Sequence, residues 1–147
     1  MSEPQLTIRA IADGEEATVI ALWNACGLTR PWNDPARDLA FARSGPASDV
    51  LVGLLGDRIV ASAMVGHDGH RGIVYYLSVD PGAKRQGYGR QMMQAAEQWL
   101  LDRGIWKINL FVRHGNEPVL AFYDSLGYEL QATALLGKWI DPSKKGG

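Results

Sequence analysis

The chain has 147 residues, enough for one domain with a full core, and its 46% apolar and 21% charged residues are ordinary for a globular protein. Its 15 Lys and Arg residues against 16 Asp and Glu residues exclude a global electrostatic reason to bind nucleic acid. No secretory signal is visible, and no apolar stretch approaches the roughly 20 residues that span a bilayer. Cys26 is the only cysteine, which excludes an internal disulfide and a cysteine metal cluster. We expect one cytoplasmic domain, 1–147, that binds neither nucleic acid nor membrane.

Hydrophobic periodicity predicts the secondary structure. In chain order the segments are a strand at 6–11, a helix at 13–26, a short helix beginning at 34–35, strands at 49–55, 58–66 and 73–79, a helix at 87–103, a strand at 106–112, a helix at 116–127, and one bent strand or a short pair at 128–140. The order β-α-α-β-β-β-α-β-α-β predicts a mixed α/β (α+β) domain with a largely antiparallel first half.

The segment 80–93, DPGAKRQGYGRQMM, joins a predicted strand to a predicted helix. Its notable residues are two glycines and three cations: Gly87, Gly89, Lys84, Arg85 and Arg90. A helix start leaves unpaired N–H groups with partial positive charge, and glycines let a phosphate or pyrophosphate approach them. A P-loop sequence is absent, and a dinucleotide fingerprint needs a third glycine where this chain has Met92. Taken alone, a glycine pair in a tight turn beside solvated cations is the simpler interpretation.

The whole unit 77–93 resembles the Gcn5-related N-acetyltransferase family, whose central motif is a strand, [QR]-x-x-G-x-[GA] and a helix. The segment 115–129, GNEPVLAFYDSLGYE, fits a second signature, while Lys84 stands where the family usually has Arg or Gln. The resemblance implies acetyl-coenzyme A as cosubstrate, with its pyrophosphate on the amides of 85–90 and its pantetheine arm paired with the backbone of 77–79. The coenzyme-binding residues implied are Leu77, Ser78, Val79, Arg85, Gln86, Gly87, Tyr88, Gly89, Arg90 and Asn116.

Acetyl transfer to an amine needs a base, a stabilised oxyanion and an acid. An amine with pKa about 10.4 costs about 4–5 kcal/mol to deprotonate at neutral pH, so base catalysis is required. A backbone N–H near 77–79 can stabilise the thioester oxygen. The resemblance assigns the acid for the departing thiolate to Tyr123, which on helical spacing alone is a core aromatic. Asn116 is expected to cap its helix in either case.

The sequence leaves the identity of the general base open. Phe111 stands where acetyltransferases acting on protein N-termini often carry a glutamate, which weakens a protein N-terminus as acceptor. The remaining candidates are Glu117, Asp68, His70, Asp34 and a water chain. His67, His70 and His114 lack the spacing of a metal site, so no metal is expected.

The resemblance places two turn-rich segments, 29–35 (TRPWNDP) and 66–72 (GHDGHRG), on the acceptor side, where we expect them to converge. The candidate acceptor residues are Trp32, Asn33, Asp34, Asp68, His70 and Arg71. The two motifs together look similar to a small bacterial subgroup of the family, a label that implies no substrate. Each residue also has a structural explanation: a helix cap for Asp34, a hairpin turn at Asp68, a core position for Trp32.

We interpret the chain as an acetyl-coenzyme A-dependent N-acetyltransferase, an acyltransferase that moves the acetyl group directly to a primary amine of a small molecule or peptide. Direct transfer follows from the expectation that Cys26 lies away from the glycine motif. The alternative is a non-catalytic acyl-coenzyme A binding or sensing module, favoured by Phe111 and opposed by Tyr123 and Asn116. Because family members often dimerise through late strands and 134–140 is apolar, the partners considered include a second copy.

Overall fold

The computed structural model describes residues 5–145, whose contacts divide the chain into two units, Met1–Asn109 and Leu110–Gly147. The first unit contains one five-stranded sheet of order β1-β2-β3-β4-β5. Its strands are β1 (Thr7–Ala10), β2 (Ser48–Leu55), β3 (Arg58–His67), β4 (Gly72–Val79) and β5 (Ile108–Asn109). Strands β1 to β4 pair antiparallel, and β5 runs parallel to β4.

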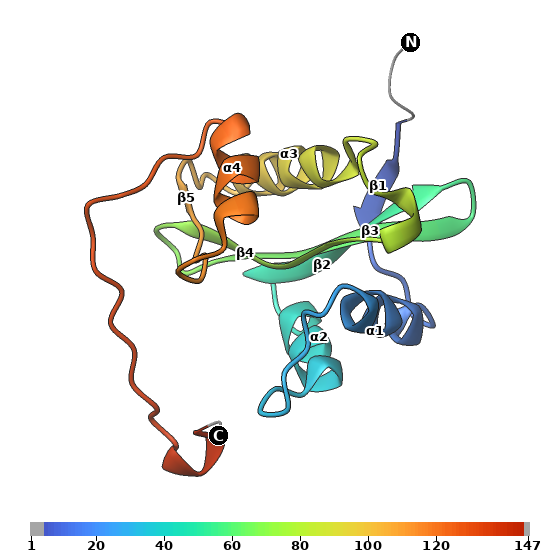
Figure 1. The fold of residues 1–147 in the computed structure, drawn as a ribbon. Helices are drawn as coiled ribbons and strands as arrows, with labels where there is room; N and C mark the ends of the chain where they lie inside the picture. Colours follow the sequence, from blue (N-terminus) through green and yellow to red (C-terminus); the bar gives the residue numbers. More distant parts are fainter. Residues whose placement is uncertain (1–4, 146–147) are drawn as a thin grey trace. The chain divides into compact units, whose positions relative to one another are not determined.

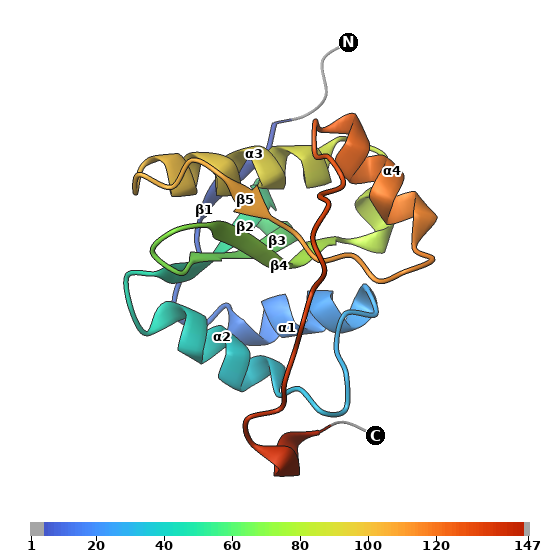
Figure 2. The ribbon, with the colours of Figure 1, turned by 90° about the vertical axis from the view of Figure 1, so that its left-hand side faces the viewer.

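Three helices cover the sheet of the first unit. They are α1 (Glu16–Ala25), α2 (Pro35–Arg43) and α3 (Tyr88–Leu101). In Figures 1 and 2, α1 and α2 lie on one face of the sheet and α3 lies on the other. Each helix turns a buried apolar stripe towards the strands, as its period of 3.6 residues requires.

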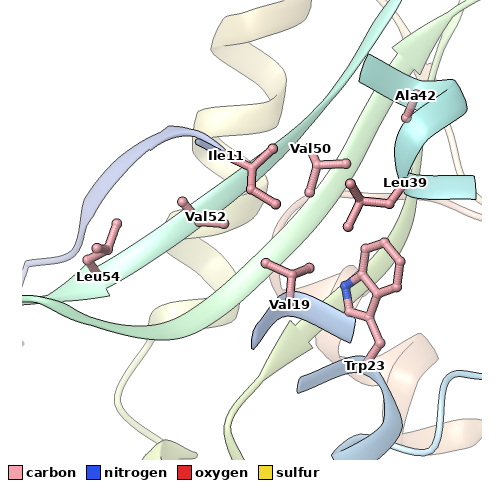
Figure 3. Packing of buried hydrophobic residues seen from close by; sticks show 8 residues of the cluster. All are labelled: Ile11, Val19, Trp23, Leu39, Ala42, Val50, Val52 and Leu54. Atoms are coloured by element: carbon pink, nitrogen blue, oxygen red, sulfur yellow. The ribbon is translucent and has the colours of Figure 1, made fainter. Parts of the chain in front are cut away.

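The core beneath α1 and α2 is a continuous apolar cluster (Figure 3). Its members are Ile11, Val19, Trp23, Leu39, Ala42, Val50, Val52 and Leu54. On the other face α3 buries Met92, Met93, Ala96 and Leu100. A Cβ at Gly53 would lie 2.8 Å from Leu6 Cδ1 and 2.9 Å from Met92 Sδ, so a bare backbone there lets α3 approach the sheet.

The second unit holds α4 (Glu117–Ser125) and a 3₁₀ turn, η2 (Pro142–Lys144). The mixed α/β fold class and the order of elements through α4 are confirmed. The structure forms no strand at 128–140, because that segment finds no ladder partner among the described residues, and the strand expected at 106–112 shortens to β5. No helix within 5–145 has the length and apolar character needed to cross a bilayer.

Candidate coenzyme site

Strand β4 is paired on both edges only at its beginning. Its pairs with β5 are Gly72 with Ile108 and Ile73 with Asn109, whereas its pairing with β3 continues to Val79. Beyond Ile73, the edge that faces β5 therefore offers its backbone N–H and C=O groups without a strand partner from the described chain. An extended ligand with amide groups can add to such an edge as a strand would.

A bulge interrupts β4 just before the predicted coenzyme residues 77–79. Ser62 pairs with Ser78 and Met64 with Tyr75, so two residues of β4 face one of β3. Tyr76 within the bulge has φ 55, a left-handed conformation that is uncommon for a residue with a side chain. Such strain persists only where the surroundings hold it, and it is concentrated at functional sites.

Two helices hold this bulge. The ring of Trp23 on α1 stacks on Tyr76, with centroids 4.0 Å apart and planes 9° apart. The Tyr76 hydroxyl donates to Asp38 Oδ2 on α2 at 2.8 Å. The sequence predicts none of these contacts, because its pattern at 73–79 is that of a regular strand.

The connection after β4 is fixed by Asp80, a residue to which the sequence pattern gives no role. Asp80 Oδ1 accepts from the Gly82 N–H at 2.8 Å and so begins the 3₁₀ turn η1 (Pro81–Ala83). Its Oδ2 pairs with Arg58 Nη2 at 2.9 Å. The hydrogen bond from the Gly82 N–H is the main cause that holds the pKa of this carboxyl below its ordinary value, and the ion pair with Arg58 lowers it further. The Asp-Pro-Gly sequence was the available signal, since aspartate before proline often starts a turn.

The glycine loop has the geometry of an anion site. Arg85 and Gly87 both take left-handed conformations, with φ 65 and 78, and α3 begins directly afterwards at Tyr88. Gly87 supplies no side-chain cap, so the first-turn amides of α3 lack the acceptor that a Ser or Asp would provide. Successive N–H groups in such conformations form a concavity that suits a phosphate, and the donor set fits a diphosphate.

The side chains of this loop divide into two kinds. The polar side chains of Lys84, Arg85, Gln86 and Arg90 are exposed around the amides. Tyr88 is only 4% exposed and anchors the helix in the core, so only its backbone is available to a ligand. Ser78 is buried too, and its hydroxyl donates to the Ser62 carbonyl at 3.3 Å.

In the second unit, Asn116 occupies the N-cap position of α4, but its side chain makes no capping hydrogen bond, contrary to expectation. The Tyr123 ring meets Phe122 and Tyr128 edge-on, with centroid distances of 5.1 and 5.4 Å. Burial raises the pKa of the Tyr123 hydroxyl above its ordinary value, so it remains a protonated donor at neutral pH. Phe111 lies outside β5 and is 53% exposed.

The candidate acceptor residues have structural partners of their own. Asp34 caps α2 by accepting from the Arg37 N–H at 3.2 Å. Asp68 Oδ1 accepts from the N–H groups of His70 and Arg71, both at 2.8 Å, and these bonds lower the Asp68 pKa. The Arg71 guanidinium lies 4.6 Å from the ring centroid of Trp106. Trp32 is 39% exposed, so the alternative explanation as a core residue is wrong, and Trp32 stays a candidate acceptor residue.

The structure does not bring the two acceptor segments together. The His67 N–H donates to the Ala47 carbonyl at 2.9 Å, so the 67–72 turn lies where the chain leaves α2 for β2. Asp34 begins α2, whose nine residues extend about 13 Å between the two places. Figure 2 draws the turn at the left edge of the sheet and the loop before α2 below the sheet at the right. The expected convergence fails because the length of α2 separates its two ends.

Cys26 lies closer to the candidate site than expected. Its thiol donates to the Val79 carbonyl at 3.2 Å, which places it beside the strand assigned to the coenzyme. From the sequence alone, this thiol is expected to lie away from the glycine motif. The reason is that α1 packs against β3 and β4, and its last turn reaches the end of β4.

The bulged β4, its open edge and the glycine loop before α3 together define an acyltransferase-like α/β protein. The sequence model of the acetyltransferase (GNAT) family matches residues 17–128, and the chain belongs to this family.

A relative supports this assignment, and solved structures share the fold. An acetyltransferase of Yersinia enterocolitica is 39% identical over 133 residues, which are 90% of this chain and 94% of that protein. A predicted acetyltransferase of Clostridium acetobutylicum, solved with acetyl-CoA, has TM-score 0.73 at 14% identity over 90% of this chain and 96% of that one. An aminoglycoside acetyltransferase from a soil metagenome, solved with sisomicin, has TM-score 0.72 at 20% identity over 91% of this chain and 96% of that one. These two structures share the fold.

Proposed function

We propose that the protein is an acetyl-coenzyme A-dependent N-acetyltransferase that transfers the acetyl group directly to a primary amine of a small molecule or peptide. The observation that carries this proposal is the uncapped start of α3, with left-handed Arg85 and Gly87, directly after the open edge of β4. The diphosphate would take the amides of 85–90, and the pantetheine would pair with the backbone of 77–79. A cytoplasmic location remains a prediction.

The proposed reaction forms a C–N bond and breaks a C–S bond. The amine nitrogen attacks the thioester carbonyl carbon, and a backbone N–H near 77–79 donates a hydrogen bond to the developing oxyanion. Coenzyme A then leaves as a thiol. The nitrogen loses one proton to a base, and Tyr123 gives one proton to the departing sulfur. Asp68 is a poor base, since its lowered pKa weakens its hold on a proton.

For the acceptor side we favour the loop residues Trp32, Asn33 and Asp34 over the turn residues. This loop continues from Cys26, whose thiol bonds the carbonyl of Val79 in the proposed coenzyme strand. The side chains of Asp68 and Arg71 are engaged with the turn backbone and with Trp106. Asp34 is engaged too, as the cap of α2, so the preference rests on the position of the loop.

An amine panel tests the proposal. Wild-type protein is mixed with acetyl-coenzyme A and single primary amines, and free thiol is followed over time. We expect thiol release above background with at least one amine, together with an acetylated product in the mass spectrum. If no amine releases thiol although calorimetry detects coenzyme A binding, the non-catalytic acyl-coenzyme A sensor becomes the better description.

Charge reversal of the glycine loop should weaken coenzyme A binding. Arg85 and Arg90 are exposed beside the proposed diphosphate amides, so the double variant Arg85→Glu/Arg90→Glu replaces two attractive charges by two repulsive ones. We expect Kd, measured by titration calorimetry, to rise at least about tenfold. Arg37→Glu/Lys144→Glu makes an equal charge change elsewhere and should leave Kd nearly unchanged. If the two double variants bound coenzyme A with equal affinity, the diphosphate could not lie on this loop.

Cys26→Ala tests whether transfer is direct. If the thiol only forms its hydrogen bond to the Val79 carbonyl and carries no acetyl group, kcat should stay within about threefold of the wild-type value. Intact-protein mass spectrometry after incubation with acetyl-coenzyme A alone should show no acetylation of Cys26. A kcat reduced about a hundredfold, together with an acetylated Cys26 in the wild type, would establish a covalent route instead.

A further inference from the structure

Asp38 on α2 is a half-buried carboxylate with a fixed orientation and no cationic partner. Its Oδ2 accepts from the Tyr76 hydroxyl at 2.8 Å, and no Arg, Lys or His within 5–145 forms an ion pair with it. The acids Asp13, Glu15, Glu16 and Asp80 all pair with arginines. A carboxylate that is partly removed from water favours an opposite charge beside it.

Tyr76 holds this carboxylate rigidly. Its backbone is fixed in the left-handed region by the bulge, and its ring is stacked on fully buried Trp23. The pKa of its hydroxyl is raised mainly by burial and also by the hydrogen bond to Asp38. Tyr76 therefore stays a neutral donor at physiological pH, so it can orient Asp38 but cannot exchange protons with a substrate.

The position of this pair matches the acceptor side of the proposed reaction. Tyr76 directly precedes 77–79, the backbone to which the thioester arm is assigned. Asp38 lies one turn after Asp34, at the beginning of the helix that follows the proposed acceptor loop. All these residues belong to the first unit.

The charge of Asp38 indicates which part of an acceptor it suits. A carboxylate raises the pKa of a neighbouring ammonium and so keeps its proton in place. The reacting amine must lose that proton, so Asp38 would hinder it. A second amino group that remains charged is stabilised by the carboxylate.

Resting on the proposed function, we propose that Asp38, oriented by Tyr76, binds a second ammonium group of the acceptor, so that the substrates are diamines or polyamines. Asp38 is then a specificity residue that contacts the substrate, and Tyr76 is a positioning residue. Trp23 supports both by fixing the Tyr76 ring.

The test compares 1,4-diaminobutane with 1-aminobutane in the thiol-release assay. Asp38→Asn keeps an oxygen for the Tyr76 hydroxyl but removes the charge. We expect KM for the diamine to rise about 10- to 100-fold with kcat changed by less than about threefold, and KM for the monoamine to stay unchanged. Tyr76→Phe should raise the diamine KM in the same direction by a smaller factor. Asp57→Asn, in the exposed turn between β2 and β3, removes the same charge and should change neither constant.

Calorimetry separates this inference from the proposed function. Binding of 1,4-diaminobutane to coenzyme A-loaded wild-type and Asp38→Asn proteins is measured without turnover, and thermal melting checks that both are folded. Loss of diamine binding in Asp38→Asn supports the ammonium site even if no amine is acetylated. Equal diamine affinity in the two proteins, or no diamine binding by the wild type, overturns the site even if monoamines are acetylated.

Discussion

Replacing Tyr123 by phenylalanine should lower kcat for acetyl transfer by about 10²- to 10⁴-fold and leave coenzyme A affinity unchanged. The substitution removes the proposed proton donor for the thiolate but keeps the ring that meets Phe122 and Tyr128. Thiol release with the best amine of the panel gives kcat, and titration calorimetry gives Kd for coenzyme A. Tyr128→Phe, which removes a neighbouring hydroxyl, should lower kcat by far less.

The pH dependence of kcat adds a second readout. The donor must be protonated, and burial raises the Tyr123 pKa, so activity should persist through neutral pH and fall only above the ordinary tyrosine value of about 10. This alkaline decrease should be absent from the residual activity of Tyr123→Phe. An unchanged kcat and an unchanged pH profile in the variant would show that Tyr123 is a core aromatic, as helical spacing alone suggests.

Trp23→Ala should lower the free energy of unfolding by about 3–5 kcal/mol. The indole is fully buried in the cluster between α1, α2 and β2, and it stacks on Tyr76. Its truncation therefore leaves a cavity and frees the β4 bulge. Urea denaturation followed by circular dichroism measures the change. We also expect Trp23→Ala to weaken diamine binding, because the Tyr76 ring, whose hydroxyl orients Asp38, loses the indole on which it stacks.

Two variants serve as controls for this stability measurement. Trp106 is 73% exposed, so Trp106→Ala should cost less than about 1 kcal/mol. Trp23→Phe keeps a ring and removes an indole N–H that is buried without a partner in the described structure, so it should cost less than Trp23→Ala. If Trp23→Ala and Trp106→Ala lowered stability equally, the core assigned to α1 would be wrong.

Much of the local structure around the candidate sites is predictable because it depends on short-range rules. Gly87 starts α3 in a left-handed conformation that glycine alone adopts freely, and Asp34 with Pro35 begins α2 as cap and first residue. The strand, glycine loop and helix lie consecutively in the chain, so a motif can identify them. The acceptor side is different, because the two segments expected to meet are held apart by the length of α2.

The amino-acid sequence by itself determined the fold class, the order of elements through α4 and the glycine loop, because periodicity, caps and turn residues act within a few positions. Only the tertiary structure decided the bulge at Tyr76, its bond to Asp38 and the approach of Cys26 to Val79. One physical reason is strand register, because one extra residue in β4 changes which side chains face α1 and α2. The other is distance along the chain: Tyr76 and Asp38 are 38 residues apart and Cys26 and Val79 are 53 apart, so each pair meets only after the sheet and helices have packed.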